Sequence, residues 1–232
     1  MFHYRDGEHR EVAAWHNEVH RPANHGGIPG IYYSQDWVAP ADYVRSRPPS
    51  DLENCGGEYA SLFLSEGTLA QLEDGARAAS EVRERAGRGH PFQAVTWRCR
   101  FEIDAVHGRD DLAYVVDAVP MAPNTGLIVR AEEILDTRRD AEYAKWQAAV
   151  EIPRLISSEL FAACFEGHRL EKDGRKTALQ LWFVDREDPL VAFEQALQMS
   201  TRGERLPDAD RLRRPILSHV YRSLAGRYDY YD

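Results

Sequence analysis

The chain has 232 residues and a formal net charge of −9, and 43% of its residues are hydrophobic. This length allows one large or two small domains, and the hydrophobic content excludes a wholly disordered chain. The acidic charge argues against a nucleic-acid partner, because binding to the phosphate backbone requires clustered positive charge.

The three cysteines, Cys55, Cys99 and Cys164, are too few and too widely spaced for a disulfide framework or a Cys-x-x-Cys zinc site. The N-terminal residues lack the apolar segment of a signal peptide. No apolar run reaches the ~18 residues of a membrane span. We therefore expect a reduced, cytoplasmic protein without a membrane partner.

Hydrophobic periodicity predicts alternating helices and strands in the first half of the chain. In chain order these are a helix over 8–21 that ends near Pro22, a strand over 31–38, a Pro- and Gly-rich loop over 39–58, a strand over 59–64, a helix over 67–88, and strands over 92–106 and 112–119. Thr68 is the expected N-cap of the 67–88 helix. Its expected buried stripe is Leu69, Leu72, Ala76, Ala79 and Val82.

The turn-forming segment 120–126 divides the chain into a first unit over 1–120 and a second over 121–232. The second unit is predicted to contain strands over 127–135, 160–170 and 178–184, helices over 140–156 (interrupted by Pro153) and 188–199, a charged turn over 171–176, a linker over 201–215 and a final extended segment.

The two units share a pattern that indicates an internal repeat. Trp15, Val19, His20 and Pro22 match Trp146, Val150, Glu151 and Pro153 at a constant separation of 131 residues. Both units have the element order β-α-β-β-α-β, which is ferredoxin-like. Because the helices of such a unit cover one face of its sheet, we expect an α+β fold in which the two sheets pack together as an intrachain α+β barrel.

The segment WHNEVHRPANHGGIPGIYYSQDWV (15–38) resembles the EthD-like branch of the dimeric α+β barrel superfamily. The resemblance is strongest over 12–38, weaker over 59–80, and extends over 127–199 as a second copy. Methylmuconolactone isomerases and small polyketide cyclases are related barrels. The resemblance implies a histidine near the helix end that faces a cavity and acts as an acid or base, and this role falls on His20.

Three histidines, His16, His20 and His25, are the candidate catalytic residues. His16 and His20 are four residues apart and share a helix face, but HNEVH is not the zinc-binding H-E-x-x-H pattern. No third ligand is placed by the sequence, so no metal site is predicted. A single histidine that titrates near neutrality suffices for acid–base catalysis. The alternative is that these are solvated histidines favoured by the dipole at a helix C-terminus.

The candidate substrate-binding residues are Tyr32, Tyr33 and Trp37, on the strand after the histidines, together with Arg100 and Glu151. Arg100 could hold a substrate carboxylate if its strand face lines the barrel. Glu151 occupies the position of His20 in the second copy, and it indicates either one surviving active site or a second pocket with different chemistry.

We expect a cofactor-independent enzyme that performs isomerase-, cyclase- or lyase-type proton transfer on a hydrophobic, aromatic or polyketide-like small molecule. One alternative is a haem-binding or haem-degrading protein or a cofactor-free monooxygenase, with His20 or His219 as the haem ligand. Another is a non-catalytic ligand-binding module of the stress response. The single-chain barrel could pair again into a homodimer.

Overall fold

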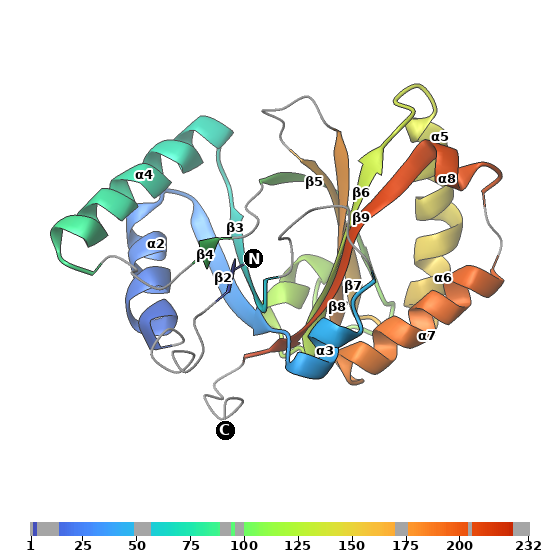
Figure 1. Cartoon of the computed structure of the whole chain (residues 1–232), viewed down its shortest axis with the longest axis horizontal. Coiled ribbons are helices and arrows are strands. Elements are labelled where there is room, and N and C mark those ends of the chain that lie inside the picture. The colour runs from blue at the N-terminus through green and yellow to red at the C-terminus, as the bar shows by residue number, and fades with distance from the viewer. Residues whose placement is uncertain are drawn as a thin grey trace.

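The structure is a computed structural model of the chain, and it describes residues 2–3, 14–48, 57–88, 94–95, 100–169, 176–203 and 206–224. It is a mixed α+β fold built on a curled antiparallel sheet (Figure 1). The strands are β1 (Phe2–His3), β2 (Ile31–Val38), β3 (Tyr59–Ser65), β4 (Ala94–Val95), β5 (Phe101–Gly108), β6 (Gly126–Ile134), β7 (Ala163–Arg169), β8 (Thr177–Val184) and β9 (Arg213–Ser223).

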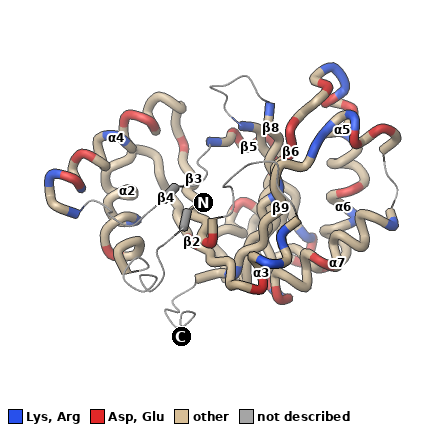
Figure 2. Tube along the Cα trace, in the orientation of Figure 1, with Lys and Arg blue, Asp and Glu red and all other residues tan. Residues whose placement is uncertain are grey.

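Two groups of helices flank the sheet, with α2 and α4 on one side and α5 to α8 on the other (Figure 1). The helical elements are η1 (His16–His20), α2 (Arg21–Gly27), α3 (Ala41–Arg45), α4 (Leu69–Arg85), η2 (Val116–Met121), α5 (Asp140–Trp146), η3 (Gln147–Glu151), α6 (Ile152–Ile156), α7 (Pro189–Arg202) and α8 (Ala209–Leu212). Acidic and basic residues are interspersed along α4 (Figure 2).

The described strands form a single hydrogen-bonded sheet in the order β4-β1-β3-β2-β9-β6-β8-β7-β5. Strands of the first predicted unit pair with strands of the second at two places. β2 pairs with β9 through Trp37 opposite Ser223 and Val38 opposite Arg222. β5 pairs with β7 along most of its length. The segments 1–120 and 121–232 therefore contribute to one shared sheet.

The hydrophobic core covers both faces of this sheet, and its inner part joins the two halves of the chain. The ring of Trp37 on β2 lies 6.4 Å from that of Phe183 on β8, and Phe183 lies 5.3 Å from Phe165 on β7. All three side chains are buried. Because successive strand residues point to opposite faces, Trp37, Phe165 and Phe183 mark the inner face of the curled sheet, and their neighbours in sequence point outward toward the helices.

Most predicted strands are confirmed. The strand expected over 31–38 is β2, that over 59–64 is β3, and that over 178–184 is β8. The segment expected over 92–106 contains β4 and β5. Predictions for Cys55, Trp97, Cys99, the start of the first helix and most of the turn over 171–176 lie outside the described residues.

The strand predicted over 112–119 is wrong, because residues 116–121 form the 3-10 helix η2. The side chains of Leu112 and Val116 both pack against Gly108, where an added Cβ would lie 3.2 Å and 2.4 Å from them. Gly108 has no side chain, and this lets the start of the helical turn lie close against β5.

The expectation that Pro22 ends the first helix and that Pro153 interrupts its counterpart is also wrong. Each proline lies at the first positions of a new helical segment, α2 or α6, that continues directly from a π-helical turn. In that turn the residue before the proline donates its N–H five residues back, from Arg21 to His16 and from Ile152 to Gln147. The wider turn accommodates a residue that has no N–H to donate.

The helix predicted over 67–88 is confirmed as α4, and Thr68 caps it through a reciprocal hydrogen-bond pair with Gln71. Its predicted buried stripe is wrong at one end, because Val82 is 64% exposed. Gly75 and Ala79 are the buried residues of α4, and Arg83 rather than Val82 continues this face toward α2.

Candidate functional site

A group of polar side chains lies between the first helix and the outer face of β2. We call His16, His20 and His25 together with Ser34 and Asp36 the histidine cluster. The histidines come from η1 and α2, and Ser34 and Asp36 are alternate residues of β2 that share one strand face. Their side-chain contacts to His25 and His16 place this face under the helix.

His16 and Asp36 form the buried part of the histidine cluster. His16 is 2% exposed and Asp36 is 7% exposed, and Nδ1 of His16 lies 3.4 Å from Oδ2 of Asp36. The Ser61 hydroxyl donates to Oδ1 of Asp36. Burial alone would raise the pKa of the Asp36 carboxyl, but the contacts with His16 and Ser61 and the nearby charge of Arg21 hold that pKa below its ordinary value. Asp36 is therefore a carboxylate that orients His16.

His20 lies next to this pair and is only half-buried. Its ring stacks on Trp15 with the ring centres 4.9 Å apart and an interplanar angle of 22°. The ring of His16 is 4.8 Å away in an edge-on arrangement, and that of Phe63 on β3 is 5.9 Å away. These contacts place His20 between the helix and the sheet, on the side opposite the inner core.

Asn24 and Arg83 fix the orientation of His20. Nη1 of Arg83 on α4 donates to Oδ1 of Asn24 at 2.8 Å, so the amide nitrogen of Asn24 is the atom that faces Nε2 of His20 at 3.1 Å. An amide nitrogen can only donate, and Nε2 therefore accepts. In the neutral ring of His20 the proton then resides on Nδ1.

Ser34 joins His25 and Arg21 at the outer end of the cluster. Nε2 of His25, which is exposed, lies 2.7 Å from Oγ of Ser34. Nε of Arg21 donates to the same Oγ at 3.1 Å. Because Oγ accepts from Arg21, its own proton can be donated to His25. Arg21 and His25 are four residues apart and share a helix face.

Tyr33 and Trp37 are not brought together with the histidines, because they lie on the inner face of β2. The Tyr33 hydroxyl lies within hydrogen-bonding distance of two acceptors, the carbonyl of Pro120 and Oε1 of Gln35, and burial raises its pKa. Nε1 of Trp37 donates to Oδ1 of Asn124 at 3.2 Å. Both residues join the two halves of the chain.

Tyr32 and Arg100 interact with residues outside the histidine cluster. Tyr32 is 50% exposed, and partial burial, followed by the negative charges of Glu66 and Asp117, raises the pKa of its hydroxyl. Arg100 donates to Glu73 on α4. Its guanidinium charge is thus already paired with a carboxylate, which leaves it less suited to hold a substrate anion.

Glu151 belongs to a separate polar cluster under the second π-helical turn. Its carboxylate accepts from Nε2 of Gln147 and from Oγ of Ser200, each at 3.3 Å, and lies 3.8 Å from Nη1 of Arg130. Gln147 and Glu151 are the counterparts of His16 and His20, 131 residues later. The same backbone turn therefore carries an imidazole pair in one half and an amide–carboxylate pair in the other.

His219, the other candidate haem ligand, is on the inner face of the sheet. It lies on β9 opposite Val129 and is 2% exposed. Its Nδ1 is 3.3 Å from the hydroxyl of Tyr221. Burial, with a smaller contribution from the charge of Arg47, lowers the pKa of His219 to about 3. The ring is therefore neutral near pH 7.

Sequence reasoning missed Arg21, Asn24, Ser34 and Ser61. Asn24 could have been found from its spacing of four residues after His20, which places both on one helix face. Ser34 and Asp36 have the two-residue spacing of a strand face, but the sequence does not say that this face meets the histidines. Cys164 is buried, and burial raises the pKa of its thiol well above the ordinary value, so it is not a nucleophile.

Within the described ranges, no three His, Cys, Asp or Glu side chains gather in a way that could hold a metal ion. None of the helices described combines the length and apolar composition needed to cross a membrane. A scan of the chain against protein-family models matches no family, and a search of curated proteins finds no match.

Proposed function

We propose that the protein is a cofactor-independent enzyme that transfers protons on a hydrophobic, aromatic or polyketide-like small molecule, in the manner of an isomerase, cyclase or lyase. His20 is its acid or base, and His16 with Asp36 supports it. The observation that carries the proposal is the buried His16–Asp36 contact of 3.4 Å beside the half-buried ring of His20.

The chemistry follows from the different exposure of the two histidines. The ring of His20 is the more exposed of the two. It would exchange a proton with a carbon next to a carbonyl group of the substrate through Nε2, after the Asn24 amide that bonds this atom has moved away. A positive charge that forms on its ring is offset by the carboxylate of Asp36, which lies behind His16. A carboxylate that orients an imidazole and stabilises its protonated form is the arrangement used in acid–base catalysis by histidine.

We further propose that the fold is two ferredoxin-like units joined as an intrachain α+β barrel, in an EthD-like relative of the dimeric α+β barrels. The strand order supports this. In β4-β1-β3-β2 the first four strands of the chain appear in the order fourth, first, third, second, and β9-β6-β8-β7 repeats that order for the four strands after residue 120. The remaining strand of the first half, β5, lies beyond β7 at the edge of the sheet. The matching π-helical turns at His16–His20 and Gln147–Glu151 support a duplication.

Proton transfer can be tested without knowing the natural substrate. The purified protein is incubated in D₂O with a panel of lactones and aromatic keto acids, and deuterium incorporation next to the carbonyl is followed by NMR. We expect incorporation with the unaltered protein and with His168→Gln, a histidine whose side chain is 48% exposed. His20→Gln should reduce the rate ~100-fold or more, and Asp36→Asn should reduce it less.

Unchanged incorporation by His20→Gln would overturn the assignment of His20. Ligand binding by both proteins without any incorporation would instead favour a non-catalytic binding module. The haem alternative is less well supported. The neutral ring of His219 has the protonation state that iron ligation needs, but the side chain is almost fully buried.

A further inference from the structure

We infer that the ligand of the histidine cluster carries a carboxylate and that Arg21 is the residue that binds it. The inference rests on the proposed function for the location of the ligand, but not for the reaction that follows binding. The sequence suggested Arg100 as the residue that binds a substrate carboxylate, but the guanidinium of Arg100 is already paired with Glu73.

Arg21 is half-buried and is held by uncharged acceptors. Its Nε donates to Oγ of Ser34 at 3.1 Å, Nη1 donates to Oδ1 of Asn17 at 2.9 Å, and Nη2 donates to the carbonyl of Ser34. Within the described residues, no carboxylate lies within ion-pair distance of its guanidinium. Asp36 interacts with it only through longer-range electrostatics. The charge of Arg21 is therefore positioned but not neutralised.

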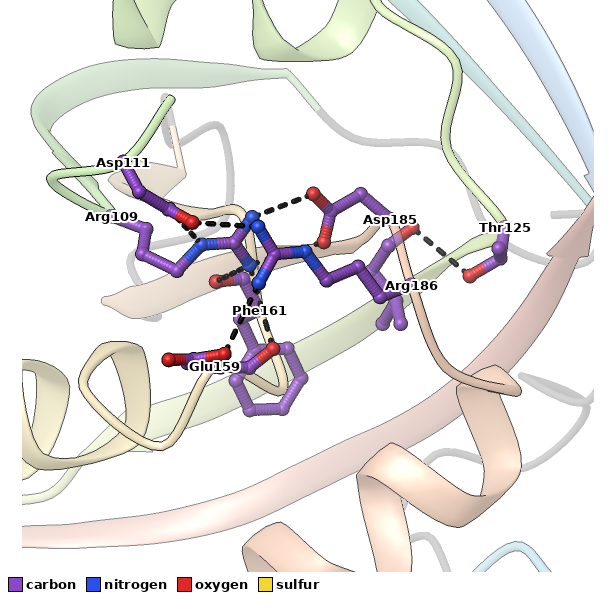
Figure 3. Close-up of polar contacts among 8 residues, drawn as sticks. Arg109, Asp111, Thr125, Glu159, Phe161, Asp185 and Arg186 are labelled. Carbon is purple, nitrogen blue, oxygen red and sulfur yellow. Dashed lines mark hydrogen bonds and ion pairs between the residues drawn. The ribbon is translucent and has the colours of Figure 1, made fainter. Parts of the chain in front are cut away.

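Several other half-buried or buried arginines among the described residues are neutralised directly. Arg109 shows this most fully (Figure 3). Its Nη2 lies 2.8 Å from Oδ2 of Asp185, its Nε donates to Asp111, and its Nη1 also reaches the carbonyl of Phe161 at 3.3 Å. Arg213 and Arg222 lie 2.8 Å and 2.7 Å from the carboxylates of Asp140 and Asp188. Arg21 differs from these in lacking a carboxylate.

The hydrogen bonds of Arg21 leave room for a ligand. A guanidinium has five N–H groups, and three of those of Arg21 are used. The remaining two, one on each terminal nitrogen, suit the two oxygens of a carboxylate. His25 contacts the same Ser34 and is exposed, so this end of the cluster is open to solvent and carries additional imidazole donors.

Charge also favours an anion at this place. Among the described side chains of the histidine cluster and those hydrogen-bonded to it, Arg21 and Arg83 carry positive charge and Asp36 is the one carboxylate. The chain as a whole has a net charge of −9. A locally cationic site in an acidic protein attracts an anionic ligand to that site in preference to the rest of the surface.

The test uses benzoate and its neutral counterpart benzamide as probes, with binding to the full-length protein followed by NMR titration. We expect the unaltered protein to bind benzoate about tenfold or more tightly than benzamide. Arg21→Gln should lose this preference, and Arg21→Lys, which keeps the charge, should retain part of it. Arg77→Gln is the matched control, because Arg77 is exposed and already pairs with Asp74.

Equal binding of benzoate and benzamide by the unaltered protein, or unchanged benzoate binding by a folded Arg21→Gln variant, would overturn the inference. His20→Gln separates this inference from the proposed function. If His20→Gln binds benzoate normally but loses deuterium incorporation, both stand. If Arg21→Gln binds benzoate normally while His20→Gln loses incorporation, the reaction stands and the carboxylate site does not. If Arg21→Gln loses benzoate while His20→Gln still incorporates deuterium, the carboxylate site stands alone.

Discussion

Pro22 and Pro153 occupy the same place in two helices that are 131 residues apart in the chain. His20 and Glu151, the last residues of the two π-helical turns, have the same backbone angles, φ −68° and ψ −52°. In both helices a π-helical turn precedes the proline and directs two side chains, four residues apart, toward the sheet. The turn is thus a property of the backbone that both halves keep while its side chains differ.

Replacement of either proline by alanine should change the free energy of unfolding by less than about 1 kcal/mol, because a proline in a compatible backbone acts mainly by restricting the unfolded chain. Urea denaturation of Pro22→Ala and Pro153→Ala measures this. Pro189→Ala, at the start of α7 and without a π-helical turn, is the control. A loss of ~3 kcal/mol or more at Pro22 or Pro153 alone would show that the π-helical turn itself depends on the proline.

Gly30, between α2 and β2, should be sensitive to substitution. It has φ +83°, and a Cβ there would lie 1.8 Å from the carbonyl oxygen of Glu66. We expect Gly30→Ala to lower the free energy of unfolding by roughly 2–4 kcal/mol. Gly26→Ala is the matched control, since a Cβ at Gly26 would meet nothing within 4 Å and alanine favours a helix. Thermal and urea denaturation should show the two variants shifting in opposite directions, and similar shifts would contradict the argument.

Arg109 ties three loops together at one end of the sheet (Figure 3). Arg109→Met would leave the carboxylate of Asp185, which is 15% exposed, without its cation. Breaking one side of a buried ion pair in this way destabilises a protein by about 3–5 kcal/mol. Chemical denaturation should show this loss, while Arg77→Ala, an exposed pair with Asp74, should change stability by less than about 0.5 kcal/mol.

The buried His219 makes stability depend on pH. Its pKa falls from 6.5 to about 3 in the folded protein because of burial. Between these values the unfolded chain takes up a proton that the folded state does not, so stability decreases as pH falls from 6.5 toward 3, by an amount on the order of a few kcal/mol. The measurement is the free energy of unfolding at a series of pH values.

His219→Gln removes the titrating group, and its stability should therefore fall less steeply over this range. Tyr221→Phe is the control, because it removes the hydroxyl next to Nδ1 and keeps the imidazole. The same slope in the unaltered protein and in His219→Gln would show that His219 is not the group responsible.

The strands were predictable because their side chains alternate, as in β2 and β3, and Thr68 was predictable because it has the spacing of a capping box. Segment 112–119 was not, because its valines favour a strand locally, whereas in the structure residues 116–121 form a 3-10 helix that packs on Gly108 through Val116. The helix ends at Pro22 and Pro153 were predicted wrongly because the rule that proline ends a helix does not consider a preceding π-helical turn.

The candidate site was predictable only in part. The spacing of His16 and His20 showed that they share a helix face, but not that this face meets Asp36. Trp37 and Asp36 are neighbours in sequence and lie on opposite faces of β2, so proximity in sequence grouped Trp37 with the wrong side chains. Which face a helix covers depends on long-range packing that one sequence does not report.

The pairing of β5 with β7 and of β2 with β9 has a consequence for how the chain is made. When the first 120 residues leave the ribosome, the partners of both strands are not yet synthesised. Strands β2 and β5 therefore each keep an unpaired edge until β9 and β7 have been translated. The nearer of these partners, β7, begins more than 50 residues after the end of β5. Severed near residue 120, the two pieces would each present the edge that the other needs, and would reassemble as fragments of one protein rather than persist as independent domains.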